Sequence, residues 1–227
     1  WEGLDKNPPE HAIEWTGKRV NGKEYTAKDK KLAHPNSRFT APAINCPCIS
    51  KEFENPAGVP VSAIVFGGRR AKCAPLVYQS RDWNHGVFVG ATMASETTAA
   101  ATGAVGVVRR DPMAMKPFVG YNMADYFGHW IEMGKKMDAD KAPKIFHVNW
   151  FRQDEEGNFM WPGFGDNMRV LLWILDRCAG KVDAVESAIG YLPKAADIDV
   201  TDLDLDAATL EELLSIPREE VIDDEVT

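Results

Sequence analysis

The sequence predicts an α+β (mixed α/β) fold, in which helices flank a mixed and antiparallel sheet. Short runs rich in Val, Ile, Phe and Tyr have the composition of strands, and longer segments with apolar residues three and four apart have the period of helices. The two kinds of segment follow one another without the regular alternation of a doubly wound parallel sheet. With 227 residues, 44% of them hydrophobic, the chain can form one sizeable core or two small lobes.

Four short runs are expected to be strands. They occupy residues 61–68, 75–80, 85–93 and 144–151. The first run ends in paired glycines, which suits a buried strand that enters a tight turn. Residues 1–37 are polar and turn-rich, so we expect loops and short strands there.

Three segments are expected to be helices. In residues 122–133 the apolar side chains on one face are Met123, Tyr126, Phe127 and Trp130. In residues 167–181 the same spacing joins Leu171, Ile174, Leu175 and Cys178. Gly180 is a suitable C-terminal stop for that second helix. A shorter helix is expected at residues 208–216, where Thr209 and Glu212 have the spacing of a capping box.

The formal net charge of -8 originates at the C-terminal end of the chain. Residues 197–227 contain twelve acidic side chains and one basic side chain, whereas the remainder carries a small positive excess. This distribution disfavours nucleic acid as a partner and leaves room for a local cationic pocket. No apolar run approaches the roughly 18 residues that span a bilayer, and no signal peptide is visible, so we expect a cytoplasmic protein without a membrane partner.

The four cysteines are too few and too unevenly spaced for a disulfide framework. Cys46 and Cys48 flank a single proline, which is not the Cys-x-x-Cys spacing of a zinc knuckle. We therefore expect ordinary buried, reduced thiols and no metal site in this chain. His85 and His147 have no evident ligand partner, and we expect both to be neutral and packed.

Two arginine motifs could bind anions. In FGGRR (residues 66–70) glycines allow a sharp turn after a strand, and the arginines that follow match phosphate oxygens bidentately. A turn with two solvated arginines remains the alternative. In HPNSRF (residues 34–39) the short polar side chains of Asn36 and Ser37 precede Arg38, a set that could bind a carboxylate or a phosphate.

Residues 95–108 consist mainly of small side chains with two glycines. Such a segment packs poorly and orders at low energetic cost, which suits a mobile lid over a site. The start of an alanine-rich helix is the alternative.

The segment NWFRQDEEGNFMWPGFGDNM (residues 149–168) combines aromatic rings with turn residues. Its first half predicts a hairpin with a charged turn, and Asp166 and Asn167 are suitable N-caps for the next helix. Rings across a hairpin and a turn can form a slot for a flat base, whose edge Asn167 could read. An ordinary aromatic core is the alternative.

No G-x-x-x-x-G-K-[ST] phosphate loop occurs in the sequence, and no His, Asp or Glu cluster has metal-ligand spacing. If the protein transfers phosphoryl groups, its phosphate loop and metal ligands lie elsewhere. The chain also lacks an initiator Met, from which we expect that it begins inside a longer protein.

Five motifs in this order, AHPNSRF, FGGRR, SETTAAA, DPMAMKPFVGYN and FHVNWF…WPGFGDN, resemble the C-terminal portion of GTP-dependent phosphoenolpyruvate carboxykinase. The resemblance covers residues 1 to about 218. It implies a carboxy-lyase of gluconeogenesis that converts oxaloacetate and GTP to phosphoenolpyruvate, GDP and CO2, with Mn²⁺ or Mg²⁺ as cofactor. It also implies that residues 1–47 end the substrate lobe and that residues 48–227 form a carboxykinase-like nucleotide lobe.

The resemblance also implies roles for individual residues. Arg38 and Arg69 would be catalytic, and the substrate segment would be Asn36, Ser37 and Arg38. The GTP-binding residues would be Arg38, Arg69, Phe151, Phe159, Phe164, Gly165, Asp166 and Asn167. The lid, an Ω-loop at residues 95–107, would contain Ser95, Glu96, Thr97, Thr98, Ala99, Ala100, Ala101, Thr102 and Gly103.

The family's phosphate loop, reactive cysteine and metal ligands precede the region matched here. We therefore expect the chain to be inactive alone, with a missing N-terminal part as its partner and a monomeric parent enzyme. A non-catalytic guanine-nucleotide-binding or assembly module derived from the same fold is the alternative. A carbohydrate-binding module would explain the rings but would leave FGGRR and the lid segment unexplained.

Overall fold

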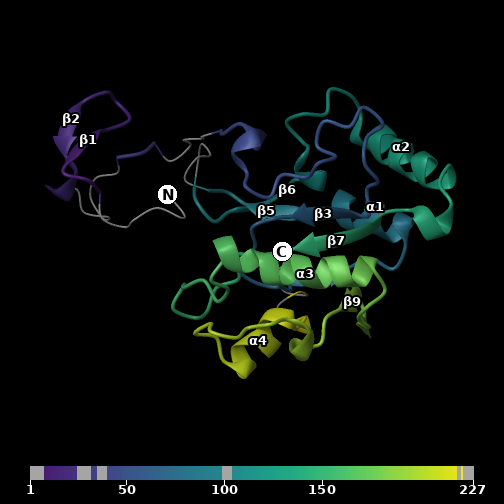
Figure 1. The fold of residues 1–227 in the computed structure, drawn as a ribbon. Helices are drawn as coiled ribbons and strands as arrows, with labels where there is room; N and C mark the ends of the chain where they lie inside the picture. Colours follow the sequence, from purple (N-terminus) through teal and green to yellow (C-terminus); the bar gives the residue numbers. More distant parts are fainter. Residues whose placement is uncertain (1–7, 25–31, 35–39, 99–103, 219–220, 222–227) are drawn as a thin grey trace. The chain divides into compact units, whose positions relative to one another are not determined.

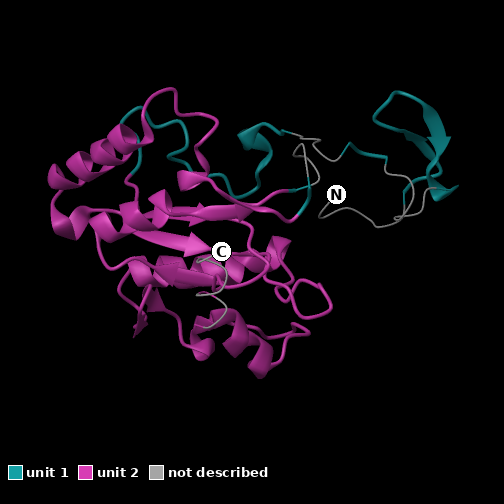
Figure 2. Cartoon of the chain, turned by 180° about the vertical axis from the view of Figure 1, so that it is seen from behind, with its two compact units in different colours: residues 1–59, 98–105 teal, residues 60–97, 106–227 magenta. Residues whose placement is uncertain are grey.

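The structure is a computed structural model that describes residues 8–24, 32–34, 40–98, 104–218 and 221. The chain divides into two compact units, one of residues 1–59 and 98–105 and the other of residues 60–97 and 106–227 (Figure 2). The expected assignment of residues 1–47 and 48–227 to two lobes of an enzyme stays a prediction.

The first unit contains a short antiparallel hairpin. Strands β1 (His11–Ile13) and β2 (Arg19–Asn21) pair with Ala12 opposite Val20. Two single 3-10 turns, Gly22–Glu24 and Ala43–Asn45, are the other regular elements among its described residues. The unit is therefore rich in loops and short strands, as its polar sequence predicts.

The second unit contains a five-stranded sheet of order β3-β7-β4-β9-β8. The strands are β3 (Ala63–Gly67), β7 (Lys144–Val148), β4 (Val77–Gln79), β9 (Gly190–Leu192) and β8 (Val185–Ser187). Only β3 and β7 pair in parallel, and the other neighbours are antiparallel. The mixed sheet, with its flanking helices, confirms the predicted fold class. A separate antiparallel pair joins β5 (Ala94–Glu96) to β6 (Val108–Arg110).

Helices cover both faces of this sheet (Figure 1). They are α1 (Trp83–Ala91), α2 (Met123–Lys135), α3 (Asn167–Cys178) and α4 (Ala207–Leu214). Single 3-10 turns occur at Pro112–Ala114, Ala139–Lys141, Phe164–Asp166 and Ala195–Asp197.

Strand β7 divides the core into two apolar clusters. Phe146 and Val148 pack with Trp161, α3 and α4, whereas Ile145 packs with Phe66, α1 and α2. Successive side chains of a strand point to opposite faces, which explains the division. Helix α2 contributes Tyr126, Phe127 and Trp130 to the second cluster, as its spacing predicts.

The predicted strand at residues 85–93 is wrong, because residues 85–91 belong to helix α1. Asp82 begins the helix by accepting a hydrogen bond from the backbone N–H of His85. Gly86 and Gly90 lie against Ile145 and Phe66, where a methyl group at either glycine would overlap the neighbouring side chain. The run of Val and Phe thus reflects burial of a helix against the sheet.

Three further predictions, two about helices and one about a hairpin, also need correction. The buried face of α3 is Val170, Trp173 and Ile174, and Leu175 is exposed. Helix α4 is capped by Asp206, which accepts from the Thr209 N–H, so Thr209 is not the cap. The predicted hairpin at residues 147–161 is reduced to one isolated bridge, between Gln153 and Phe159. Its charged turn is nevertheless closed by a hydrogen bond from Asp154 N to Asn158 O.

The expectation of buried thiols is also wrong for two of the four cysteines. Cys46 and Cys48 are exposed, with their sulfur atoms 3.6 Å apart. Cys73 is buried and Cys178 is half-buried. No disulfide joins any of the four among the described residues.

Candidate functional site

Two of the predicted motifs meet at the carboxyl ends of β3 and β7. The two strands are parallel, with Gly67 opposite Val148 as their last pair, so the segments that follow them leave the sheet at the same edge (Figure 1). One segment is the arginine turn, defined as residues 68–71, and the other begins the aromatic stretch at Asn149. The carboxyl ends of parallel strands are the usual place for ligand sites in such sheets.

The guanidinium group of Arg69 lies over the ring of Phe151. Its Cζ atom is 3.8 Å from the ring centroid, which is a cation–π contact. The ring of Phe159 meets Phe151 edge-on, with the centroids 5.8 Å apart and the planes at 71°. Three of the predicted site residues therefore form one contiguous group.

Phe164 stands apart from this group. Among the described residues, ring contacts join Phe151 to Phe159 and join neither of them to Phe164. Phe164 is 62% exposed and has a positive φ of 44°. It follows Gly163, whose φ of 76° allows the chain to turn sharply after Pro162. A non-glycine residue in this region is strained, and such strain often occurs at functional sites.

The other rings of the stretch, Trp150 and Trp161, belong to the core cluster around α3. Trp161 is fully buried, and its indole N–H donates to Asn167 Oδ1 over 2.8 Å. Asp166 Oδ1 lies 3.0 Å from the Arg169 Nε. Asp166 occupies the N-cap position of α3 as predicted, but its side chain makes no capping hydrogen bond and bonds to Arg169 instead.

The base of the predicted lid holds the arginine turn through three hydrogen bonds. Arg69 N donates to Ser95 Oγ over 3.0 Å, and Arg69 O accepts from Glu96 N over 2.8 Å. The Glu96 carboxylate accepts from Ala71 N over 2.7 Å. Both backbone groups of Arg69 are thus bonded to β5, and Glu96 has a role at this site that its place in the predicted lid did not reveal.

The two ends of the predicted lid form an antiparallel ladder. Ser95 pairs with Arg109, and beyond the paired residues Thr97 N donates to Val107 O while Val107 N donates to the Thr97 side-chain Oγ1. Ala94–Glu96 is a strand, so the alternative of a helix start does not apply to these residues. Residues 99–103, which include Ala99, Ala100, Ala101, Thr102 and Gly103, lie outside the described residues.

Asn149 links the arginine turn to the aromatic stretch, and sequence reasoning did not single it out. It has no exposed surface, and its side chain makes four hydrogen bonds to the backbone. The signal for this role is a short polar residue directly after the apolar strand KIFHV. A buried amide requires partners, but the sequence does not say where they are.

Arg70 and His147 are both buried beside the site, at 7% and 5% exposure. The alternative of two solvated arginines in FGGRR is therefore wrong for Arg70. Burial, and secondarily the charge of Arg70, lowers the pKa of His147 to about 4. His147 is neutral at pH 7 and packed as predicted, and its ring stacks on Tyr78 with the centroids 5.2 Å apart.

The substrate segment predicted from the sequence, Asn36, Ser37 and Arg38, lies outside the described residues. Within the described residues, no group of three His, Cys, Asp or Glu side chains could hold a metal ion. The residues that the structure describes therefore do not fit a divalent cation. No helix in the described part of the chain has both the length and the apolar character to cross a membrane.

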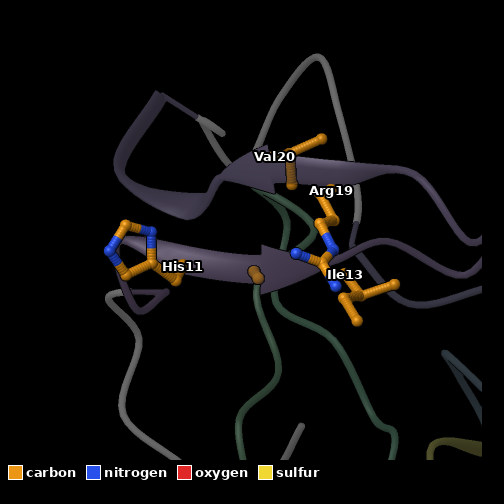
Figure 3. Close-up of a pocket in the computed structure, with 5 residues that line it drawn as sticks. His11, Ile13, Arg19 and Val20 are labelled. Carbon is orange, nitrogen blue, oxygen red and sulfur yellow. The ribbon is translucent and has the colours of Figure 1, made fainter.

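The first unit has a hollow of about 320 Å³ on the β1–β2 hairpin. It is lined by His11, Ala12, Ile13, Arg19 and Val20. Figure 3 shows Arg19 beside Ile13 near one end and His11 at the other. None of these residues is among the predicted site residues, and we assign the hollow no function.

Comparison with known proteins identifies the family. A family model described as the phosphoenolpyruvate carboxykinase C-terminal P-loop domain matches residues 1–226. The chain belongs to the GTP-dependent phosphoenolpyruvate carboxykinase family. The resemblance inferred from its motifs is thereby confirmed.

Relatives in the carboxykinase family are about half identical to this chain. The GTP-dependent phosphoenolpyruvate carboxykinase of Treponema pallidum strain Nichols is 52% identical over 219 residues, which cover 95% of this chain and 35% of that protein. That of Anaeromyxobacter sp. strain K is 54% identical over 205 residues, or 90% of this chain and 33% of its own length. That of Renibacterium salmoninarum is 50% identical over 217 residues, covering 95% and 35%. The chain thus spans about a third of the length of the curated relatives that it matches.

Proposed function

We propose that this chain supplies the guanine-nucleotide-binding part of a carboxykinase that converts oxaloacetate and GTP to phosphoenolpyruvate, GDP and CO2. One observation carries the proposal. The Arg69 guanidinium, whose geometry suits a phosphate, lies on the Phe151 ring, whose face suits a flat base, and the Phe159 ring meets Phe151 edge-on. A base and its phosphates would need these two chemistries side by side.

In this proposal Phe151, Phe159 and Phe164 are the walls of the guanine slot. The exposed Phe164 ring covers the base when nucleotide binds, and the segment Gly165, Asp166 and Asn167 reads the base edge. Arg69 stabilises the negative charge on the phosphoryl group during transfer, because phosphoryl transfer depends mainly on positioning and charge stabilisation.

The remaining predicted residues complete the proposal. Asn36, Ser37 and Arg38 bind the oxaloacetate or phosphoenolpyruvate, with Arg38 also near the nucleotide phosphates. Residues 95–107 close over the site and exclude water, which protects a reactive enolate from protonation. The Mn²⁺ or Mg²⁺ that the family resemblance implies would be held by residues outside this chain. A role in gluconeogenesis and a place in the cytoplasm belong to the same proposal.

Nucleotide titration tests the guanine slot. The intact gene product is titrated with GDP and with ATP while Trp fluorescence is followed. We expect GDP to bind more tightly than ATP, and Phe164→Ala to raise the Kd for GDP about tenfold, because one stacked ring is worth roughly 1–3 kcal/mol. The matched control is Phe118→Ala, which removes another exposed ring, 75% exposed, and should leave the Kd unchanged.

Equal affinity for GDP and ATP, or an unchanged GDP affinity in Phe164→Ala, would contradict the slot. An assay of oxaloacetate decarboxylation with GTP separates the enzyme from its alternative. Guanine-selective binding without any turnover would favour the non-catalytic nucleotide-binding module.

A further inference from the structure

The side chain of Asn149 joins the two halves of the proposed site. Its Oδ1 atom accepts hydrogen bonds from Arg70 N and from Phe151 N, each over 3.2 Å. Its Nδ2 atom donates to Arg70 O over 2.9 Å and to Ala74 O over 3.1 Å. Both backbone groups of Arg70 are therefore bonded to the one amide that also holds the backbone of Phe151.

The side-chain amide of Asn149 joins the two segments just beyond the end of the β3–β7 ladder. The parallel pairing of β3 and β7 stops at Gly67 opposite Val148, so the ladder does not extend to Arg69 or to Phe151. Asn149 Oδ1 instead bridges the N–H groups of Arg70 and Phe151, which are neighbours of the contact between the Arg69 guanidinium and the Phe151 ring. One backbone hydrogen bond, from Gln153 N to Ala71 O over 3.0 Å, also joins the two segments, and Asn149 is the buried side chain that bonds to both of them.

Asparagine has the hydrogen-bonding groups that this place requires. Its carbonyl oxygen has two lone pairs for two N–H groups, and its NH2 group has two hydrogens for two carbonyl groups. Aspartate has the acceptor but no donor, and serine is too short to reach both sides. The four bonds also leave little freedom for the side chain, because it has no exposed surface.

We propose that Asn149 is a positioning residue that sets the distance between the guanine wall at Phe151 and the phosphate-binding Arg69. It touches neither ligand group and acts through the backbone on both sides. Asn149 therefore affects the affinity for ligands that carry both a base and phosphates, because only these ligands must match the distance between Phe151 and Arg69. This inference rests on the proposed function.

The test compares a nucleotide with its base-containing fragment. In the intact gene product, the Kd values of GTP and of guanosine are measured by calorimetry for the wild type and for Asn149→Ser. We expect the Kd of GTP to rise about tenfold and that of guanosine to change less than twofold. Asn149→Asp keeps the bridging oxygen and loses the donors, and we expect an intermediate GTP affinity.

A stability control separates positioning from general damage. Val87→Ala removes a buried side chain of α1 that takes no part in this hydrogen-bond network, and it should lower the melting temperature without changing either Kd. An unchanged GTP affinity in Asn149→Ser, or equal losses for GTP and guanosine, would overturn the role of Asn149. If the wild type binds GTP no better than ATP, the proposed function itself fails.

A second measurement covers the case in which Asn149→Ser does not fold. Hydrogen exchange of the wild type should show slow exchange at the Arg70 and Phe151 amides, with both slowed further and together by GTP. Fast exchange at either amide, or a response of only one of them to GTP, would contradict the bridge.

Discussion

At the scale of single residues, the site depends on backbone hydrogen bonds more than on the side chains that its motifs display. Arg69 reaches Phe151 with its guanidinium, but its backbone N–H and C=O are bonded to Ser95 and Glu96. The arginine turn is thus held by hydrogen bonds to Ser95 and Glu96 on one side and to Asn149 on the other. A charged side chain fixed in this way loses little entropy when it meets a phosphate, which favours binding.

His147 provides a prediction at the same scale. Its pKa is lowered to about 4 in the folded protein from a usual value of 6.5, first by burial and then by Arg70. Between these values the unfolded chain binds a proton that the folded chain does not, so acidification from pH 6.5 to pH 4 destabilises the fold. The loss amounts to about 3 kcal/mol at most, and it is absent above pH 6.5.

We expect His147→Phe, which keeps a ring against Tyr78, to flatten the pH dependence of the unfolding free energy between pH 6.5 and pH 4. Urea unfolding at several pH values measures this slope. The control is His129→Gln on the exposed side of α2, which should retain the wild-type slope. An unchanged slope in His147→Phe would show that another group binds the proton.

At the scale of elements, α1 shows how close packing overrides local composition. Gly86 lies against Ile145 of β7, and a methyl group there would overlap the Ile145 side chain. We expect Gly86→Ala to lower the free energy of unfolding by about 2 kcal/mol, the usual cost of overpacking a tight core. The matched control is Gly128→Ala in α2, where a methyl group meets no atom within 4 Å.

Gly128→Ala should stabilise the protein by about 1 kcal/mol, because alanine is the better helix former. Urea unfolding of both variants gives opposite signs if the helix–sheet contact decides the effect. A stabilising Gly86→Ala would mean that α1 can move away from β7 at little cost.

At the scale of the whole molecule, the sequence predicts helices and strands better than it predicts which distant residues bond to one another. Strands β3 and β7 and helices α2 and α3 follow from composition and period, since these reflect local burial. The run at residues 85–93 misleads, because a helix buried against a sheet can be as rich in Val and Phe as a strand. The roles of Asn149 and Glu96 could not be predicted, because the residues to which they bond in the arginine turn lie 79 and 25 positions away along the chain.

The C-terminal helix α4 illustrates a long-range partner that no local pattern indicates. The buried guanidinium of Arg152 donates to the carbonyl oxygens of Glu212 and Ser215, over 2.7 and 3.3 Å, at the C-terminal end of α4. The Glu212 carbonyl also accepts from the N–H and the hydroxyl group of Ser215, so the guanidinium adds to this cap, and a cation is favourable at this end of a helix. The same stretch that carries the proposed guanine slot therefore holds α4 on the core.

We expect Arg152→Met, which keeps much of the side-chain volume, to lower the free energy of unfolding by about 3 kcal/mol, because the two hydrogen bonds from the buried guanidinium to the Glu212 and Ser215 carbonyl groups are lost. Urea unfolding measures the loss, and hydrogen exchange should show it first in α4. Lys135→Ala, which removes an exposed ion pair with Glu132, should cost less than about 0.5 kcal/mol. Equal losses in the two variants would mean that α4 is held by the apolar contacts of Leu210, Leu213 and Leu214 alone.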